Sequence, residues 1–169
     1  MDETTLSLAY PLRKCWMKRG RQTRLPAHTG FRQLVHLIGA YDWTTDALHT
    51  LTVDRKTSQE FIAFLEHVCL EWYPEDPVVL VMDNVSYHHS APVRAMLSLL
   101  APRVQVIWLP KYSPDMNPIE RLWLHLKHIV YANRLYPSLP ALVEAIQLFL
   151  QIQNIADHPL RFVSAKSFR

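Results

Sequence analysis

Apolar residues in the first part of the chain follow the pattern of strands. The apolar, β-branched segments 34–41 and 47–53 are separated by a short polar stretch with the length of a hairpin loop. Shorter extended segments are expected at residues 4–10 and 15–18, on either side of a turn at Pro11. The chain is therefore expected to begin with strands, and the segments 34–41 and 47–53 should pair antiparallel.

The spacing of apolar residues then changes to that of helices. Within 57–72 they recur at intervals of three and four residues, and Thr57 with Glu60 forms a T-x-x-E capping box. The apolar runs 78–82 and 104–109 predict strands, and the first is so continuous that we expect it to be buried on both faces. Three further helices are expected, with polar N-caps: Ser90, Asn117 and Ser138.

This order of elements predicts an α/β fold. Strands come first, helices then alternate with strands, and two helices end the pattern. Hairpins followed by helical crossover connections produce a mixed sheet with helices on its faces. The length of 169 residues and the hydrophobic content of 49% suit one compact core. We expect one domain over residues 1–154, followed by an irregular tail over 155–169.

Composition excludes several classes of protein. No apolar run is long enough for a membrane span, and the first residues lack the apolar block of a signal peptide. Cys15 and Cys69 lie far apart without metal-ligand or redox spacing, which is typical of a reduced compartment. The 9 histidines are scattered and show no paired spacing for zinc. We therefore expect a cytoplasmic protein without a zinc site.

Positive charge is concentrated near the N-terminus. The net charge is +3, and six of the 18 basic residues fall between positions 13 and 24, with Trp16 among them. Residues 57–93 contain no Lys or Arg. This uneven distribution of charge is typical of a protein that presents one face to phosphates. A solvent-exposed hairpin with basic side chains would produce the same pattern.

Two acidic residues occupy positions where ligands are often bound. Asp83 follows the apolar run 78–82, and open α/β sheets bind ligands at the carboxyl ends of their strands. An Asx turn leading out of the strand is the alternative for Asp83. Glu120 lies three residues after Asn117, where it would complete a capping box. It also follows a turn over 112–118 in which two prolines restrict the backbone, and a fixed position is what a metal ligand requires.

The chain resembles one protein family in four segments that occur in the family's order. These are MDET at its start, CWMKRG at 15–20, VLVMDNVSYHHS at 79–90 and LPKYSPDMNPIERLWLHLK at 109–127. They are similar to the DDE transposases of the mariner-like superfamily, in particular their bacterial insertion-sequence branch. The resemblance extends over nearly the whole chain. It implies an α/β, ribonuclease H-like domain in which a mixed β-sheet is flanked by helices.

The resemblance also implies a catalytic, metal-binding triad of Asp2, Asp83 and Glu120. The activity implied is divalent-metal-dependent cleavage of phosphodiester bonds at the ends of a DNA element, with strand transfer into target DNA. Carboxylates suit Mg²⁺ or Mn²⁺, and two ions would serve both ends of an in-line displacement. His88 and Asn117 are expected to play secondary, positional roles.

DNA is the expected partner, both as the terminal repeats of the element and as the target. A homodimer is a further expectation, and the localisation implied is cytoplasmic and nucleoid-associated, without a membrane. Phosphate contacts give affinity that does not depend on sequence. We assign them to nine basic residues: Arg13, Lys14, Lys18, Arg19, Arg21, Arg24, Lys111, Arg121 and Lys127.

The sequence departs from the family's pattern at its start. Relatives carry a helix-turn-helix region before the catalytic core, and their first aspartate lies inside a strand, whereas Asp2 directly follows Met1. We interpret the sequence as a reading frame separated from an upstream half, with a truncated first strand. Such a chain is expected to keep the fold and the triad but to be a poor transposase. Glu3 should face away from Asp2, because neighbours on a strand point to opposite faces.

Two other functions remain open at this point. The chain could be a catalytically inactive transposase remnant that binds DNA or dimerises with an intact transposase. A ribonuclease H-like nuclease of RNA–DNA hybrids would share the fold and the metals. The SPDMNPIE turn and the basic region around Trp16 speak against the second alternative.

Overall fold

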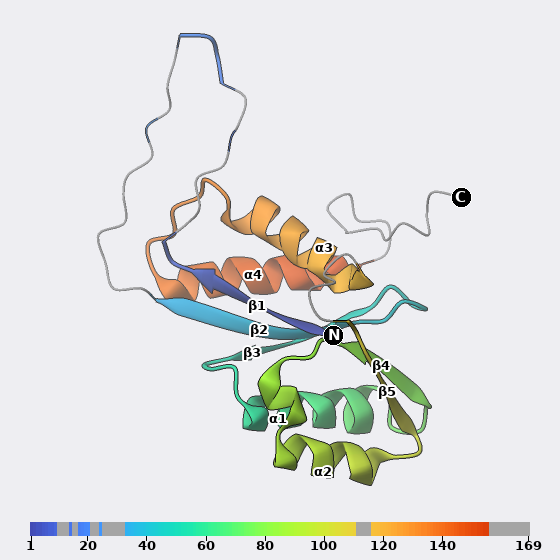
Figure 1. The fold of residues 1–169 in the computed structure, drawn as a ribbon. Helices are drawn as coiled ribbons and strands as arrows, with labels where there is room; N and C mark the ends of the chain where they lie inside the picture. Colours follow the sequence, from blue (N-terminus) through green and yellow to red (C-terminus); the bar gives the residue numbers. More distant parts are fainter. Residues whose placement is uncertain (10–13, 15–16, 21–23, 25–32, 111–115, 156–169) are drawn as a thin grey trace.

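The computed structural model describes residues 1–9, 14, 17–20, 24, 33–110 and 116–155. Within these, η1 and η4 are π-helical turns that continue α1 and α3, and η2 is a 3₁₀ helix. The elements follow in the order β1 (Asp2–Ser7), β2 (Leu34–Tyr41), β3 (Leu48–Val53), α1 (Ser58–Glu66), η1 (His67–Trp72), β4 (Val78–Met82), η2 (Ser86–His89), α2 (Ala91–Leu100), β5 (Val104–Trp108), α3 (Pro118–Leu126), η4 (Lys127–Tyr131) and α4 (Leu139–Gln153) (Figure 1).

The strands form an antiparallel sheet and a parallel pair. The order of the first is β1-β2-β3, and its register places Asp2 opposite Gly39. In the second, β4 and β5 run parallel and are connected through η2 and α2. The two sheets meet where the main-chain nitrogen of Met1 donates to the carbonyl oxygen of Val81 at 2.6 Å. The α/β class is therefore confirmed, with the parallel and antiparallel parts divided between two sheets.

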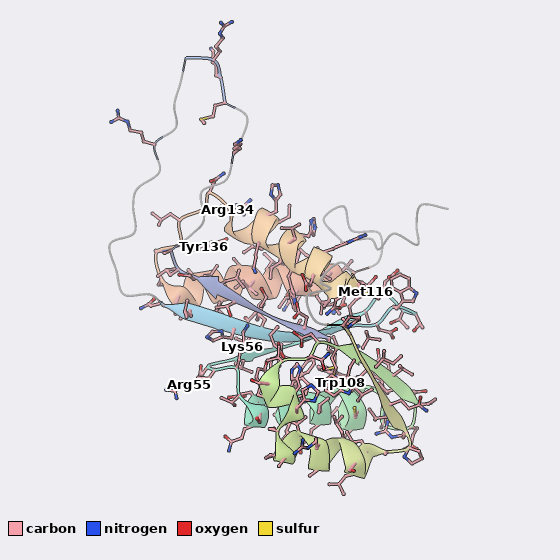
Figure 2. All side chains as sticks on the ribbon, viewed as in Figure 1. Arg55, Lys56, Trp108, Met116, Arg134 and Tyr136 are labelled. Carbon is pink, nitrogen blue, oxygen red and sulfur yellow. The ribbon has the colours of Figure 1, made fainter. Side chains whose placement is uncertain are left out.

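Helices cover the antiparallel sheet on both sides. Helices α3 and α4 lie on one face, whereas α1 and α2 lie on the other side, beside the β4-β5 pair (Figure 1). Side chains fill the space between the layers (Figure 2). Leu6 and Leu37 pack in a cluster with α3 and α4, and Ile38 packs in a second cluster with α1. Alternation along β1 and β2 thus divides the interior into two hydrophobic cores.

The predicted apolar stripe of α3 is confirmed. Ile119, Leu122, Trp123 and Leu126 are all buried against the antiparallel sheet. Burying a side chain of this size contributes roughly 1.5–3 kcal/mol. This stripe holds the start of α3, and hence Glu120, in a fixed place relative to the sheet.

Residues 78–82 are not buried on both faces, so that prediction is wrong. Leu80 and Met82 are buried, but Val79 is 56% exposed and Ile107 on the neighbouring strand is 53% exposed. The reason is that α1 and α2 supply the core for one face, while the alternate side chains of β4 and β5 point to the other. An apolar run need not mean burial on both sides of a sheet.

The predicted helix starts are correct in position but not always in chemistry. The Thr57 hydroxyl accepts a hydrogen bond from the Glu60 amide at 3.3 Å, and Ser138 caps α4 through the Ala141 amide. Ser90 and Asn117 occupy N-cap positions without a side-chain cap bond. None of the described helices has the length and apolar character needed to cross a membrane. The turn at Pro11, the segment at Cys15 and Trp16, and the tail beyond Ile155 lie outside the described residues.

Candidate functional site

Asp2 and Glu3 point to opposite faces of β1, as expected for neighbours on a strand. Asp2 pairs with Gly39 in the sheet, on the face that packs against α3. Glu3 lies on the other face, where its carboxylate contacts His88. The first strand therefore presents one carboxylate to each of the two hydrophobic cores.

Helix α3 approaches the sheet very closely beside Asp2. A Cβ atom on Gly39 would lie 2.6 Å from the ring of Trp123 and 3.1 Å from Ile119. Only a residue without a side chain allows this approach of helix to strand. It brings the first turn of α3, which holds Glu120, next to Asp2, the partner of Gly39.

Met1 links the end of β4 to the start of α3. Its nitrogen donates to Val81 on β4, and its carbonyl accepts a buried hydrogen bond from the Asn117 side-chain amide at 2.9 Å. Asn117 thus does not cap α3 with its side chain but holds the residue before Asp2. Asn117 and Glu120 therefore do not form the capping box that was one explanation for Glu120, because the Asn117 side chain makes no cap bond.

The pKa of Asp2 reflects its burial and the negative charges of neighbouring carboxylates. Burial raises the pKa of Asp2 to about 7, and the negative charges of Glu3, Glu120 and Asp83 act in the same direction. Asp2 on β1 is therefore close enough to Asp83 after β4 and to Glu120 on α3 to interact with their charges. Among the described residues, however, the group of ligand atoms that lie within 4.8 Å of one another contains Asp83 and neither Asp2 nor Glu120. A group of repelling oxygen ligands fits a hard divalent cation, which would remove the repulsion.

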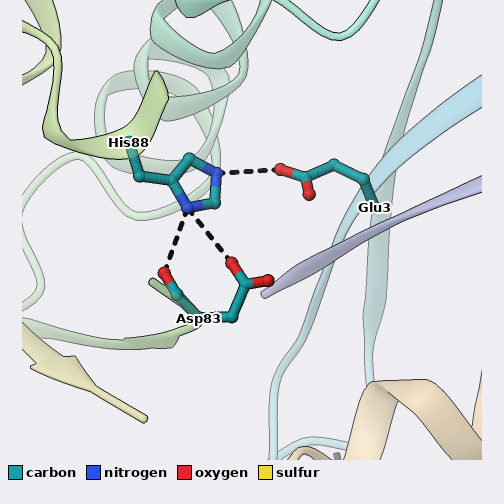
Figure 3. Close-up of side chains that lie close together, drawn as sticks. All are labelled: Glu3, Asp83 and His88. Carbon is teal, nitrogen blue, oxygen red and sulfur yellow. Dashed lines mark hydrogen bonds and ion pairs between the residues drawn. The ribbon is translucent and has the colours of Figure 1, made fainter. Parts of the chain in front are cut away.

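His88 lies between Asp83 and Glu3 (Figure 3). Its Nε2 is 2.9 Å from Glu3 Oε1, and its Nδ1 is 3.2 Å from both Asp83 Oδ1 and the Asp83 carbonyl oxygen. The ring is 1% exposed and packs on Phe61 with ring centroids 4.0 Å apart. Carbonyl and ionised carboxylate oxygens only accept hydrogen bonds, so this arrangement favours protons on both ring nitrogens.

The pKa values in this cluster follow from its geometry. Burial alone would lower the pKa of His88, but hydrogen bonds to Asp83 and Glu3 outweigh burial and raise this pKa to about 9. The same hydrogen bond from His88 lowers the pKa of Asp83. Asp83 is thereby held as a carboxylate, which is the form that binds metal.

Sequence reasoning did not identify Glu3 as a site residue. Among the described residues, Glu3, Asp83 and His88 form a group whose potential ligand atoms all lie within 4.8 Å of one another. The resemblance placed a histidine after Asp83, and alternation placed Glu3 on the face opposite Asp2. Only the fold shows that this opposite face is the one that meets His88.

The carboxyl ends of β4 and β5 are tied together beside Asp83. The Asn84 amide donates to the Leu109 carbonyl at 2.6 Å, and its oxygen lies 3.0 Å from His89 Nε2. The His89 ring lies on that of Trp108 with centroids 4.2 Å apart, and Trp108 is labelled in Figure 2. These contacts fix the segment that carries Asp83.

The predicted DNA-binding residues are surface residues where the structure describes them. Lys127 is half-buried. Arg13, Arg21 and Lys111 lie outside the described residues, as do Trp16 and most of the turn before Asn117. The exposed members of the set are Lys14, Lys18, Arg19, Arg24 and Arg121. Because their side chains are exposed, these cations are accessible to phosphates. Their contact with DNA stays a prediction.

Replacing Asn117 with alanine is expected to lower the free energy of unfolding by about 1–3 kcal/mol, because the Met1 carbonyl then remains buried without a partner. The affinity for Mn²⁺ should fall as well, since Asp2 follows Met1. Urea unfolding and Mn²⁺ titration measure the two effects.

Asn154→Ala is the matched control, because the Asn154 side chain forms hydrogen bonds with the main chain of Leu48 through both its oxygen and its nitrogen. Equal loss of Mn²⁺ affinity in both variants would contradict the role of Asn117.

The fold is that of solved transposase structures. The Mos1 transposase paired-end complex with left transposon end matches with a TM-score of 0.70 at 18% sequence identity, over 94% of this chain and 48% of that chain. The Mos1 mariner paired-end complex with Mn matches with a TM-score of 0.67 at 17% identity, over 94% of this chain and 48% of that one. The likeness establishes a ribonuclease H-like α/β fold.

The chain belongs to the DDE superfamily endonucleases, whose family model matches residues 1–143. It is 27% identical over 150 residues to the insertion element IS630 uncharacterized 39 kDa protein of Shigella sonnei, covering 89% of this chain and 43% of that protein. It is 40% identical over 65 residues to the transposable element Tc3 transposase of Caenorhabditis elegans, covering 38% of this chain and 19% of that protein. The chain thus spans less than half the length of these relatives. Membership of the superfamily implies a divalent metal.

Proposed function

We propose that this chain is the catalytic domain of a DNA transposase, in which Asp2, Asp83 and Glu120 bind two divalent ions, Mg²⁺ or Mn²⁺. The observation that carries the proposal is the convergence of charge at Asp2. Carboxylates that are far apart in the sequence raise its pKa together with its burial. Because the chain belongs to the DDE superfamily endonucleases, we interpret these carboxylates as metal ligands for DNA cleavage.

The residues fit divalent ions because the donors are carboxylate oxygens and their negative charges repel one another at Asp2. When bound, such ions activate water and stabilise the leaving oxygen of a phosphodiester. The chain supplies rigid positions: Asp2 on β1, Asp83 after β4 and Glu120 on α3. Partial burial of Asp2 lowers the local dielectric, which strengthens its attraction to a cation.

The proposed substrates are the terminal repeats of a DNA element and a target DNA. Exposed cations such as Lys18, Arg19 and Arg121 would bind the phosphates. Binding through phosphates weakens steeply as salt increases, so the affinity should depend strongly on ionic strength. We include a homodimer and a cytoplasmic, nucleoid-associated location in the proposal. Support for the dimer comes from the similar Mos1 structures, which are paired-end complexes.

A nicking assay tests the proposed activity. The chain is incubated with a supercoiled plasmid carrying element ends, in Mg²⁺, in Mn²⁺ or in EDTA. The expected result is nicked product that forms slowly with either metal and not with EDTA, in keeping with a poor transposase that keeps the triad. Lack of nicking with both metals, together with inhibition of an intact relative added to the same reaction, would contradict the proposal and assign the chain as an inactive remnant.

A further inference from the structure

Glu3 and Asp83 contact opposite edges of the same histidine ring. His88 Nε2 is 2.9 Å from Glu3 Oε1, and His88 Nδ1 is 3.2 Å from Asp83 Oδ1 (Figure 3). We propose that Glu3 is a positioning residue for the catalytic metal site: through His88 it fixes the carboxylate of Asp83. This inference rests on the proposed function, in which Asp83 is a metal ligand.

The cluster is a chain of hydrogen bonds and an ion pair rather than a separate metal site. Nε2 and Nδ1 lie on different edges of the ring, so one ion cannot replace both contacts. His88 Nε2 is at hydrogen-bond distance from Glu3 Oε1 (2.9 Å), and Nδ1 is at hydrogen-bond distance from the Asp83 carbonyl oxygen (3.2 Å), while the 3.2 Å contact of Nδ1 with Asp83 Oδ1 is an ion pair. An imidazole nitrogen binds a metal at about 2.0–2.1 Å, which is much shorter than all of these distances. The geometry therefore assigns His88 to the role of a donor to two acceptors.

Asp83 needs support because no regular element holds it. It follows the last residue of β4, and its side chain is 38% exposed. His88 Nδ1 lies within 3.2 Å of its carbonyl oxygen as well as of its carboxylate, so the ring fixes both the main chain and the side chain. Since His88 contacts one of the two carboxylate oxygens, the direction of the other is set by the ring.

His88 depends in turn on Glu3. The ring is buried, and its Nε2 would lie without a partner in an apolar setting beside Phe61 if the Glu3 carboxylate were removed. The Glu3 side chain is itself only 5% exposed and stands on β1, where its residue pairs with Ile38. One strand thus places two ligands: Asp2 directly, and Asp83 through Glu3 and His88.

The test is the substitution Glu3→Gln, which keeps the size of the side chain and removes its charge. Mn²⁺ binding is measured from the electron paramagnetic resonance signal of free Mn²⁺, well below the melting temperature. We expect the affinity to fall roughly 10–100-fold, the effect typical of partners that orient metal ligands. In nicking, half-maximal activity should need correspondingly more metal, while the rate at saturating metal changes less. A purely structural role would lower the melting temperature without moving these values.

Glu71→Gln is the matched control. Glu71 pairs with His67 at 2.8 Å, but both side chains are exposed and neither contacts Asp83. Mn²⁺ affinity in Glu71→Gln should equal that of the wild-type chain. If Glu3→Gln does not fold, Glu3→Asp, which shortens the reach to His88, takes its place in the comparison.

The outcomes separate this inference from the proposed function. Wild-type affinity for Mn²⁺ in a folded Glu3 variant, together with weakened binding in Glu120→Gln, overturns the positioning role alone. Weakened binding in Glu3→Gln with unchanged binding in Glu120→Gln sustains the positioning role and contradicts the triad. A wild-type chain that binds no Mn²⁺ overturns both.

Discussion

Replacing Glu120 with glutamine should reduce metal-dependent DNA nicking by on the order of a hundred- to a thousand-fold, which corresponds to losing several kcal/mol of charge stabilisation in the transition state. The amide has the shape of the carboxylate but not its charge. Glu120 is exposed and Asn117 makes no side-chain cap bond with α3, so the fold should be unaffected within about 0.5 kcal/mol. Initial rates at saturating Mg²⁺ measure the loss, and urea unfolding checks the stability.

Glu144→Gln serves as the comparison, because Glu144 is also an exposed helical glutamate but lies on α4. It should nick DNA at the wild-type rate. Binding of a short duplex should be unchanged in both variants, since the cations proposed to contact phosphate remain. Full activity of Glu120→Gln would remove Glu120 from the catalytic site.

Replacing Gly39 with alanine should lower the free energy of unfolding and weaken metal binding together. The new Cβ would lie 2.6 Å from the Trp123 ring, a distance that requires β2 and α3 to move apart. Overpacking of this kind costs about 1–3 kcal/mol of unfolding free energy. Separation of α3 from β2 also moves Glu120 away from Asp2, so Mn²⁺ affinity should fall as well. Urea unfolding and Mn²⁺ titration measure both changes.

A second substitution tests whether the clash is with Trp123. Trp123→Leu removes the ring atoms nearest to Gly39, at the cost of a cavity. Gly39→Ala should lower the free energy of unfolding less in the Trp123→Leu background than in the wild-type chain. The difference is a favourable coupling energy between the two positions. Strict additivity would show that the penalty at position 39 comes from elsewhere.

Local patterns predicted most elements of this fold. The hairpin of β2 and β3, the helix after Thr57 and the stripe of α3 depend on the spacing of nearby apolar residues and on short caps. The exposure of Val79 could not be predicted in this way, because the burial of a strand face depends on which helices cover it. The pattern along β4 is equally apolar on its covered and its uncovered face.

The site was predictable only in part for a similar reason. Asp83 stands out at the end of an apolar strand, and Glu120 follows a rigid turn. The contact between Glu3 and His88 joins residues 85 positions apart, and that between Asn117 and Met1 joins residues 116 positions apart. Neither leaves a local signal: Asn117 has the sequence pattern of an ordinary N-cap, and its amide nevertheless bonds elsewhere.

The division of the interior into two cores has a consequence for how the molecule is held together. Leu6 and Trp123 belong to the core on the side of Glu120, whereas Met1 and Met82 belong to the core that leads to Asp83. Metal held by carboxylates from both sides would fasten these halves across the boundary that Met1 spans with its bond to Val81. Occupancy of the site would then govern how rigidly the two halves are joined. The ion that serves catalysis would also hold the two halves together.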